Sequence, residues 1–340
     1  MGGDKVQGKD PRSVGLYLGK FAPFHLGHEF MINEALKTVE KLTVLIYEAP
    51  GLTEVPLARR ANWIRTFNSD IEVIECPDGP TDVTYEITGM QEHEKYVISK
   101  LENRSITHFF SSEPYGKHMS AALGAEDVRI DEARESLPIS ATKIRDDFYA
   151  QRKFLNPGVY FDHLIKVVLL GAPSTGKSTL AEKLAEHFKT THMPEYGREY
   201  WELNNIQRRL TPEQLLEIAE THRERELTMG HEANQFLFID TNALTTEIFS
   251  HYYHGDSLPR LRELSHETKE RYDLVLLCGD DIPYDDTADR SGESNRSDFQ
   301  KTTTEELKKR GIKYHEVTGS IQDRISQVSR ILESMTKGNA

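Results

Sequence analysis

The stretch VGLYLGKFAPFHLGHEFMINEALKTVEKLTVLIY, Val14–Tyr47, predicts the fold of the first half of the chain. Val14–Leu18 is a short apolar run of the kind that forms a buried strand, and Thr43–Tyr47 (TVLIY) is a second one. Between them, Glu29–Leu42 places its apolar residues on one side of a helix. A strand, a helix and a strand in this order favour a parallel sheet with right-handed crossovers.

The same alternation continues along the first half of the chain. Further helices are expected over Arg59–Phe67, Met90–Leu101 and Ser140–Tyr149, and further strands over Ile71–Ile74 and His108–Ser111. The segment QRKFLNPGVYFD, Gln151–Asp162, contains Asn-Pro-Gly and shows no clear period, so we expect a domain boundary within it. We therefore predict a flexible leader over residues 1–13, an α/β domain over 14–155 and a second α/β domain over 156–340.

The second half opens with another strand and helix. Lys166–Leu170 (KVVLL) has the composition of a buried strand, and Thr179–Phe188 follows it as a helix. Further strands are expected over Phe236–Asp240 and Leu274–Cys278, and further helices over Gln214–Met229 and Ile321–Met335. Asp280–Arg296 is polar, acidic and without period, which is typical of a loop and compatible with a lid over a site.

The composition excludes several classes of protein. The chain has 340 residues, of which 37% are hydrophobic, so two packed domains are expected. A formal net charge of −13 argues against a general nucleic-acid binder. The two cysteines, Cys76 and Cys278, have no CxxC spacing, which disfavours a disulfide framework or a structural zinc site. Because no segment approaches ~20 apolar residues and no signal peptide is recognisable, we expect a cytoplasmic protein without membrane partners; oligomerisation stays open.

The segment GKFAPFHLGHEFMI, Gly19–Ile32, has the features of a phosphate site. It follows a strand and opens a helix, where ligands of parallel sheets bind and where free backbone N–H groups attract anions. His25 and His28 can donate N–H groups to phosphate oxygens. The alternative is that both histidines only cap the helix or lie on the surface. A zinc pair is not favoured, because no third ligand falls nearby.

A second segment, LPISATKIR at Leu137–Arg145, has a natural N-cap in Ser140 and a permanent positive charge in Arg145. Together with HLGH, ISATKIR resembles the paired signature of the nucleotidylyltransferase superfamily. The resemblance implies a Rossmann-like domain in which an acceptor phosphate attacks the α-phosphate of ATP and pyrophosphate leaves. It also implies that His25 and His28 hold ATP phosphates and the transition state, and that Ser140 and Arg145 bind the β- and γ-phosphates.

The segment GAPSTGKST, Gly171–Thr179, fits the pattern GxxxxGK[ST] between a strand and a helix, which is the context that a P-loop needs. In such a loop the backbone N–H groups surround the β-phosphate, Lys177 reaches the β- and γ-phosphates, and Ser178 binds Mg²⁺. We expect nucleotide contacts from Gly171, Ser174, Thr175, Gly176, Lys177, Ser178 and Thr179.

Five side chains elsewhere in the second half would complete a kinase. Asp240 ends the strand FLFID and would orient Mg²⁺ or its water, or else caps the strand end. Glu195, in PEYGREY, would take the proton from a substrate hydroxyl, or else simply starts a helix. Arg198 in the same segment is predicted to be a further nucleotide contact. Arg290 and Arg296 would neutralise charge on the transferred phosphoryl group, unless their loop is merely solvated.

An adenylyltransferase signature followed by a P-loop resembles the NadR-type bifunctional enzymes, nicotinamide-nucleotide adenylyltransferase and ribosylnicotinamide kinase. The resemblance covers nearly the whole chain through KFAPFHLGH, SSEPYGKHM, ISATKIR, GAPSTGKST, PEYGRE and FIDTNALTT. It implies an NAD salvage route that uses ATP and Mg²⁺: nicotinamide riboside is phosphorylated, and the mononucleotide is then joined to AMP.

The same resemblance implies further binding residues in the first domain. Gly19, Lys20 and Phe21 would contact the nucleotide, although Lys20 is equally compatible with a solvated strand end. Glu113 and Tyr115 of SSEPYGK would line the nucleotide side of the pocket.

The chain departs from the family pattern in two ways. Only about 13 residues precede the first expected strand, so we expect neither a helix-turn-helix domain nor direct DNA binding. The segment CPDGPTDVTYEITG, Cys76–Gly89, lacks the tryptophan that the family usually has there, and Tyr85 would have to stack on the pyridine ring instead. Two alternatives therefore stay open: a similar fusion enzyme with a different acceptor, and a nucleotide-binding regulator without catalysis.

Overall fold

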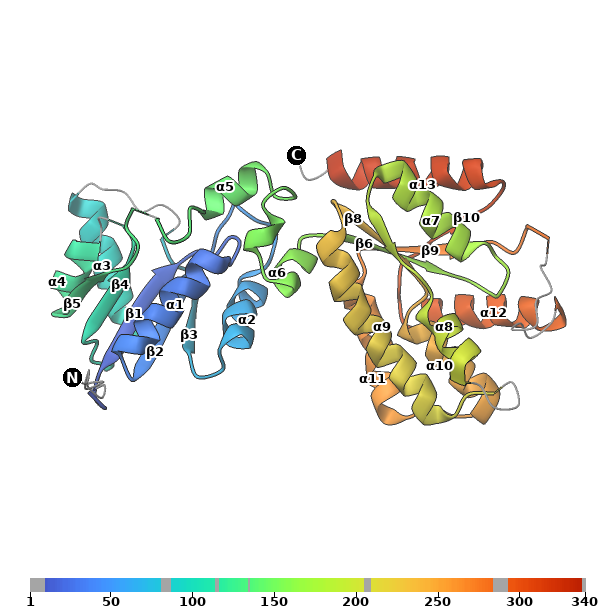
Figure 1. Cartoon of the computed structure of the whole chain (residues 1–340), viewed down its shortest axis with the longest axis horizontal. Coiled ribbons are helices and arrows are strands. Elements are labelled where there is room, and N and C mark those ends of the chain that lie inside the picture. Colours follow the sequence, from blue (N-terminus) through green and yellow to red (C-terminus); the bar gives the residue numbers. More distant parts are fainter. Residues whose placement is uncertain are drawn as a thin grey trace, which may run out of the picture. The chain divides into compact units, whose positions relative to one another are not determined.

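The computed structural model describes residues 10–80, 87–113, 116–133, 135–204, 209–283 and 293–337. The chain forms two compact units, Met1–Asp162 and His163–Ala340 (Figure 1). Each unit contains a five-stranded parallel sheet with helices packed around it, which confirms the predicted α/β class. In the described ranges, no helix combines the length and the apolar character that crossing a membrane requires.

The sheet of the first unit has the strand order β3-β2-β1-β4-β5. Its strands are β1 (Val14–Gly19), β2 (Lys41–Tyr47), β3 (Glu72–Cys76), β4 (His108–Ser111) and β5 (Glu126–Arg129). Because β1 is central and its neighbours are β2 and β4, the chain winds in opposite directions on the two sides of β1. Such a reversal opens a crevice at the carboxyl ends of the strands, where ligands bind. The segment that follows Gly19 lies at this crevice.

The helices of the first unit are α1 (Leu26–Thr38), α2 (Leu57–Phe67), α3 (Ile87–Leu101), α4 (Gly116–Leu123), α5 (Ala141–Asp146), the 3-10 helix η1 (Arg152–Phe154) and α6 (Pro157–Phe161). The helix predicted to end at Leu42 ends at Thr38, because Leu42 pairs with Gly15 in the sheet. The pattern missed α4 and β5; β5 has the sequence EDVR and is an edge strand without an apolar run.

The first unit continues past residue 155, where the sequence suggested a boundary. Tyr160 in α6 stacks on Phe148 with the ring centroids 5.3 Å apart. The indole N–H of Trp63 donates to Asp162 at 2.7 Å. These contacts attach α6 to the first unit, so the division between the units falls after Asp162.

The sheet of the second unit has the order β10-β9-β6-β8-β7. Its strands are β6 (Ile165–Leu170), β7 (Thr191–Met193), β8 (Phe236–Asp240), β9 (Leu274–Cys278) and β10 (His315–Val317). Its helices are α7 (Lys177–Phe188), α8 (Tyr196–Asn204), α9 (Pro212–Glu232), α10 (Ala243–His254), α11 (Pro259–Arg271), α12 (Glu293–Lys309) and α13 (Ile321–Lys337). The loop predicted over 280–296 is wrong at its end, because α12 begins at Glu293.

One face of the second sheet carries the main apolar core. The residues that meet there come from β6, α7, β8, β9 and α13 and include Val167, Leu169, Leu180, Leu184, Phe238, Leu276, Val328 and Leu332. Figure 1 shows α9, α10 and α11 on the other side of the sheet. The loop Gly171–Gly176 therefore leaves the central strand β6 between two packed layers, which fixes both of its ends.

Candidate active sites

The first site is a cavity of about 390 Å³ in the first unit. The loop after β1, the start of α1 and the segment before α5 form its walls. It brings together all the described residues that the sequence predicted for this site: Gly19, Lys20, Phe21, His25, His28, Glu113, Ser140 and Arg145. Tyr85 and Tyr115, which were also predicted, lie outside the described residues.

His25 and His28 cap the helix that they begin. The Nδ1 atom of His25 accepts a hydrogen bond from the Gly27 N–H at 3.1 Å, and Nδ1 of His28 accepts one from the His25 N–H at 3.2 Å. The two rings stack with centroids 3.7 Å apart. Because Nδ1 accepts in both rings, the neutral imidazoles carry their proton on Nε2. Helix capping and donation to a phosphate therefore use different nitrogen atoms of the same side chains.

The neighbouring residues fix the orientation of the two rings. A Cβ atom at Gly27 would lie 2.9 Å from the His25 ring, so glycine keeps space for that ring. Phe21 has a positive φ of 46° and meets the His28 ring edge-on at a centroid distance of 4.8 Å. Phe24 lies parallel to His28 at 5.8 Å. The imidazole of His28 is thus held between two buried phenyl rings.

Arg145 joins the two sequence motifs of the first unit. Its guanidinium donates to the carbonyl of Ala22 at 2.6 Å and to the Thr142 hydroxyl at 3.2 Å. Ser140 caps α5 by accepting a hydrogen bond from the Lys143 N–H at 3.2 Å. The ISATKIR segment is therefore attached directly to the loop that carries the histidines.

The second site is a cavity of about 220 Å³ in the second unit. Its walls include the following residues that the sequence predicted: Gly171, Ser174, Thr175, Gly176, Lys177, Ser178, Thr179, Glu195 and Arg198. Arg290, predicted for the same site, lies outside the described residues.

The loop Gly171–Gly176 has three residues with positive φ: Gly171 (138°), Ser174 (61°) and Gly176 (79°). Glycine adopts such angles without strain, whereas Ser174 does not, and strain of this kind is concentrated at functional loops. The Lys177 ammonium donates to the carbonyls of Gly171 and Ala172 at 3.0 and 2.9 Å. The lysine therefore lies folded across its own loop, over the place where a phosphate would bind.

Asp240 lies beside this loop at the end of β8 and is fully buried. Among the residues that the structure describes, no group forms a hydrogen bond to either of its carboxylate oxygens. Burial raises the pKa of Asp240 to about 7, and the negative charge of Glu195 adds to this effect. Lys177 and Ser178 act in the opposite direction and lower it in part. A buried carboxylate near a serine hydroxyl fits a hard divalent cation.

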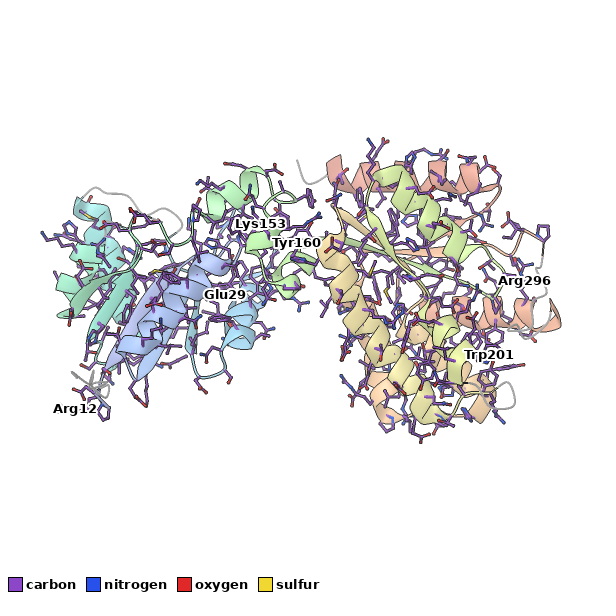
Figure 2. All side chains as sticks on the ribbon, in the orientation of Figure 1. Arg12, Glu29, Lys153, Tyr160, Trp201 and Arg296 are labelled. Carbon is purple, nitrogen blue, oxygen red and sulfur yellow. The ribbon has the colours of Figure 1, made fainter. Side chains whose placement is uncertain are left out.

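Arg296 reaches the loop from α12 (Figure 2). It is buried, and it donates to the carbonyls of Ser174 at 3.0 Å and Ile282 at 2.9 Å. In this structure Arg296 therefore contacts the backbone of the P-loop.

Two family models match the chain. Residues 16–147 match the family described as cytidylyltransferase-like, and residues 166–324 match the family described as AAA domain. The chain is also similar to two curated proteins named trifunctional NAD biosynthesis/regulator protein NadR. The protein from Escherichia coli (strain K12) is 26% identical over 90% of this chain and 79% of its own length. The protein from Salmonella typhimurium (strain LT2) is 27% identical over 89% of this chain and 78% of its own length.

The chain is thus similar to NadR proteins along about nine-tenths of its length. A crystal structure of NadR protein in complex with NR is 21% identical, with a TM-score of 0.56, and covers 94% of this chain and 95% of its own. A second, in complex with NAD and AMP-PNP, has the same identity and coverage and a TM-score of 0.54. These likenesses agree with the α/β fold of both units of this chain.

The two cavities also contain residues that the sequence did not predict. In the first cavity the hydroxyl of Tyr47 lies 2.8 Å from Nε2 of His93. The second cavity is also lined by Trp201, His222, Asn242, Phe249 and Tyr253. A single histidine within a helix, such as His93, gives no pattern to detect. Trp201 directly follows PEYGREY, so its place in the sequence could have indicated that it lines the second cavity.

Proposed function

We propose that the chain is a bifunctional NAD salvage enzyme. The second unit would phosphorylate nicotinamide riboside with ATP, and the first would join the mononucleotide to AMP and release pyrophosphate. The observation that carries this proposal is the presence of two different cavities on one chain, each at the carboxyl end of the central strand of its own sheet and each lined by residues predicted to bind phosphate. The similarity to NadR proteins over about nine-tenths of the chain supports this pair of reactions.

In the kinase reaction a bond forms between the 5′ oxygen of the riboside and the γ-phosphorus of ATP, and ADP leaves. The N–H groups of the loop and Lys177 hold the β- and γ-phosphates. Glu195, which lines the same cavity, accepts the proton of the 5′-hydroxyl. Lys177 exchanges its bonds to Gly171 and Ala172 for bonds to the nucleotide.

Asp240 and Ser178 are the residues that would hold Mg²⁺ in the second unit. The buried, unsatisfied carboxylate of Asp240 supports this assignment. A bound Mg²⁺ would neutralise charge on the phosphates and align them. The described residues contain no cluster of three or more His, Cys, Asp or Glu that could hold a metal. Mg²⁺ in kinases needs only one or two side chains, because phosphates and water complete its shell.

In the adenylyl transfer a phosphate oxygen of the mononucleotide attacks the α-phosphorus of ATP, and pyrophosphate leaves. No covalent enzyme intermediate is required. The Nε2–H groups of His25 and His28 and the guanidinium of Arg145 would stabilise the negative charge that develops. The rest of the acceleration comes from holding the two substrates in line.

The acceptor side of the first cavity has its own aromatic wall. Tyr47 and His93 line it together with Pro80. Burial lowers the pKa of His93, so its ring is neutral at physiological pH. A NadR protein has been crystallised with NAD and AMP-PNP, which supports a pyridine nucleotide in a site of this kind. Tyr47 and His93 would offer the pyridine ring an uncharged aromatic surface in place of the tryptophan that the segment Cys76–Gly89 lacks.

A product assay tests the proposal directly. The purified protein is incubated with Mg·ATP and either nicotinamide riboside or nicotinamide mononucleotide, and ADP, pyrophosphate and NAD are measured. We expect ADP and NAD from the riboside, and pyrophosphate and NAD from the mononucleotide. ADP without NAD would mean that the first unit has another acceptor. No turnover of either compound would favour a regulator.

A further inference from the structure

Arg324 is a buried residue of α13 that belongs to none of the motifs used above. It is only 2% exposed, whereas Asp323, Arg330 and Glu333 of the same helix are exposed. Its guanidinium donates four hydrogen bonds, all to groups outside its own helix. A buried arginine with this many partners fixes the positions of the segments that it contacts.

Three of the four acceptors are backbone carbonyls in loops that follow neighbouring strands. Nη1 donates to Thr175 at 2.7 Å, Nη2 donates to Gly279 at 3.2 Å, and Nε donates to Gly319 at 3.1 Å. These residues follow β6, β9 and β10, which are adjacent in the sheet. Arg324 thus connects the P-loop to the two loops beside it.

The contact with Thr175 controls the direction of a phosphate-binding group. In a trans peptide the C=O of one residue and the N–H of the next point in nearly opposite directions. When Arg324 holds the Thr175 carbonyl on the outer side of the loop, the N–H of Gly176 is turned to the inner side. Arg296 acts in the same way on the Ser174 carbonyl and thereby on the N–H of Thr175. Two successive N–H groups are oriented before any nucleotide arrives.

Asp281 is the counter-charge that makes this burial possible. One of its oxygens accepts from Nη2 of Arg324 at 2.7 Å, and the other accepts from the Gly319 N–H at 2.6 Å. Burial by itself raises the pKa of Asp281, but these hydrogen bonds outweigh it and hold the pKa below its usual value. A charged arginine in the interior is tolerated only with such a partner.

We propose that Arg324 is a positioning residue of the kinase reaction, which sets the backbone of the P-loop for the phosphates of ATP. The proposal rests on the kinase function proposed above. Lysine at position 324 keeps the charge but cannot reach four acceptors in different directions. We expect R324K to lower kcat/KM for ATP by roughly 10- to 100-fold, because small errors in position have effects of this size. The KM for the riboside and the rate of adenylyl transfer should stay unchanged.

The test compares R324K with R330K, a matched change in the same helix. Arg330 is exposed, and its Nε bonds to Ser326 within α13. Kinase turnover is followed by ADP, which adenylyl transfer does not produce, while NAD formation from the mononucleotide reports on the first unit. Thermal unfolding shows at which temperatures each variant is folded. A selective loss in kcat/KM for ATP in folded R324K, absent in R330K, supports the proposal.

Normal ATP kinetics in folded R324K would overturn it. So would a parallel loss for ATP and riboside that follows a lowered unfolding temperature, because that result describes a structural role alone. If the wild-type protein forms no ADP from the riboside, the proposed kinase function fails. The positioning role is then decided by binding: Mg·AMP-PNP should raise the unfolding temperature of the second unit less in R324K than in R330K. An equal increase would contradict it.

Discussion

Asp240 illustrates at the scale of a residue how function conflicts with stability. Its carboxylate is fully buried, and no hydrogen bond within the described residues satisfies it. Burial raises its pKa to about 7, far above the value of an unfolded chain. The charged form therefore destabilises the nucleotide-free protein. Such an arrangement is expected where a cation that arrives with the substrate supplies the missing partner.

The change D240N should stabilise the nucleotide-free protein in a pH-dependent way. Since the folded pKa exceeds the unfolded pKa, the wild-type chain loses stability as pH rises from about 4 to 7, and the loss is constant above that range. The variant lacks this loss, so its advantage should grow over the same range to about 2–4 kcal/mol at pH 8. Thermal unfolding from pH 4 to 8 measures it.

The same variant should lose ADP formation, since Asp240 is a proposed ligand of Mg²⁺. The first unit serves as the control, because its NAD formation from the mononucleotide should be unchanged. A stability difference that does not vary with pH would show that folding leaves the pKa of Asp240 unchanged.

The residues proposed to bind phosphate were predictable from the sequence, and the residues that support them were not. His25, Ser140 and Lys177 belong to local patterns with fixed spacing, and all three line the cavities where they were expected. Arg324 bonds to a carbonyl 149 positions away, and no local pattern encodes such a contact. From the sequence alone, it is one charged residue on a helix.

Among the secondary-structure elements, helix α2 is attached to the first sheet by Arg60, which is fully buried. Its guanidinium donates to three carbonyls, those of Lys20 (2.5 Å), Tyr47 (2.9 Å) and Val55 (3.0 Å). Lys20 directly follows β1, and Tyr47 is the last residue of β2. Arg60 therefore fixes the carboxyl ends of both strands beside the first cavity. Glu48 supplies the counter-charge at 3.1 Å.

We expect R60M to reduce the stability of the first unit by about 3–5 kcal/mol, because it leaves buried carbonyls and a carboxylate without their donor. The matched control is R59M in the same helix. Arg59 is 55% exposed and lies 3.6 Å from Asp162, so its loss should cost about 1 kcal/mol or less. Denaturant unfolding measures both. Equal effects of the two changes would show that the bonds of Arg60 add little.

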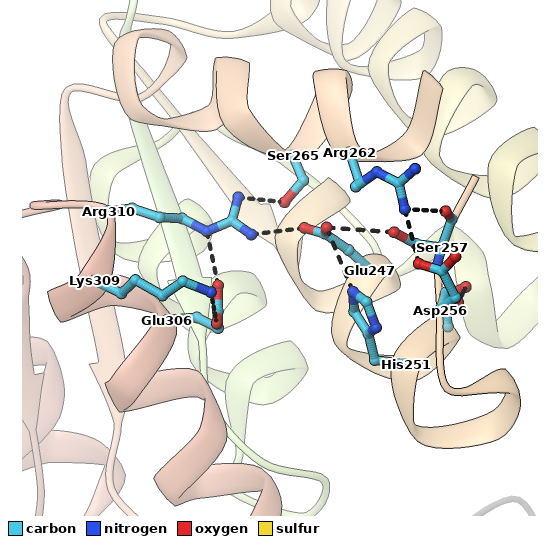
Figure 3. Close-up of polar contacts among 10 residues, drawn as sticks. Glu247, His251, Asp256, Ser257, Arg262, Ser265, Glu306, Lys309 and Arg310 are labelled. Atoms are coloured by element: carbon cyan, nitrogen blue, oxygen red, sulfur yellow. Dashed lines mark hydrogen bonds and ion pairs between the residues drawn. The ribbon is translucent and has the colours of Figure 1, made fainter. Parts of the chain in front are cut away.

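Three helices of the second unit meet in a network of charges around Arg310 (Figure 3). Its guanidinium donates to Glu247 of α10 at 2.7 Å, Ser265 of α11 at 2.8 Å and Glu306 of α12 at 3.1 Å. Glu247 is buried and also accepts from Ser257. Because α12 also carries Arg296, this network anchors the helix that supports the P-loop.

The change R310M should therefore reduce the stability of the second unit by about 2–4 kcal/mol, mostly through the charge left on Glu247. R262M provides a control within the same network, because Arg262 is 40% exposed and bonds to Asp256 and Ser257 in the adjoining turn. Its effect should be about 1 kcal/mol or less. Denaturant unfolding measures the loss of stability in both variants. A larger loss in R262M than in R310M would contradict the expectation.

The central strands of both sheets were predictable, whereas three of the four edge strands that the structure describes were not. VGLYL, FLFID and LVLLC are apolar runs, and the structure has strands at all three. The strands β5, β7 and β10 have four residues or fewer, and each lies at an edge of its sheet. An edge strand is partly exposed to solvent, so it does not need an apolar run. The helices α10 and α11 were also missed, because polar residues interrupt their apolar positions.

At the scale of the whole molecule, each proposed reaction has a complete set of residues within one unit. The first cavity is lined by residues between Tyr17 and Arg145, and the second by residues between Gly171 and Tyr253. Within the described residues each lining comes from a single unit, so we expect neither reaction to require side chains from the other unit. In the proposed route, the second unit would make the mononucleotide and the first would consume it.

This separation predicts that two defective variants can complement each other in solution. H28A should block adenylyl transfer and leave ADP formation intact, whereas K177A should do the reverse. Neither variant alone should form NAD from nicotinamide riboside. An equimolar mixture should form it after a lag, because free mononucleotide must accumulate and move between molecules. NAD and mononucleotide are measured over time, with the wild-type protein at the same total concentration as the control.

The presence or absence of a lag in the wild-type reaction shows whether the mononucleotide is released into solution. A wild-type reaction that shows the same lag as the mixture means that the mononucleotide is released into solution in both cases. A wild-type reaction without a lag means that the product reaches the first unit of the same chain before it escapes. If each variant keeps its own step but the mixture forms no NAD, the independence of the two sites is wrong, and the mononucleotide must pass within one molecule.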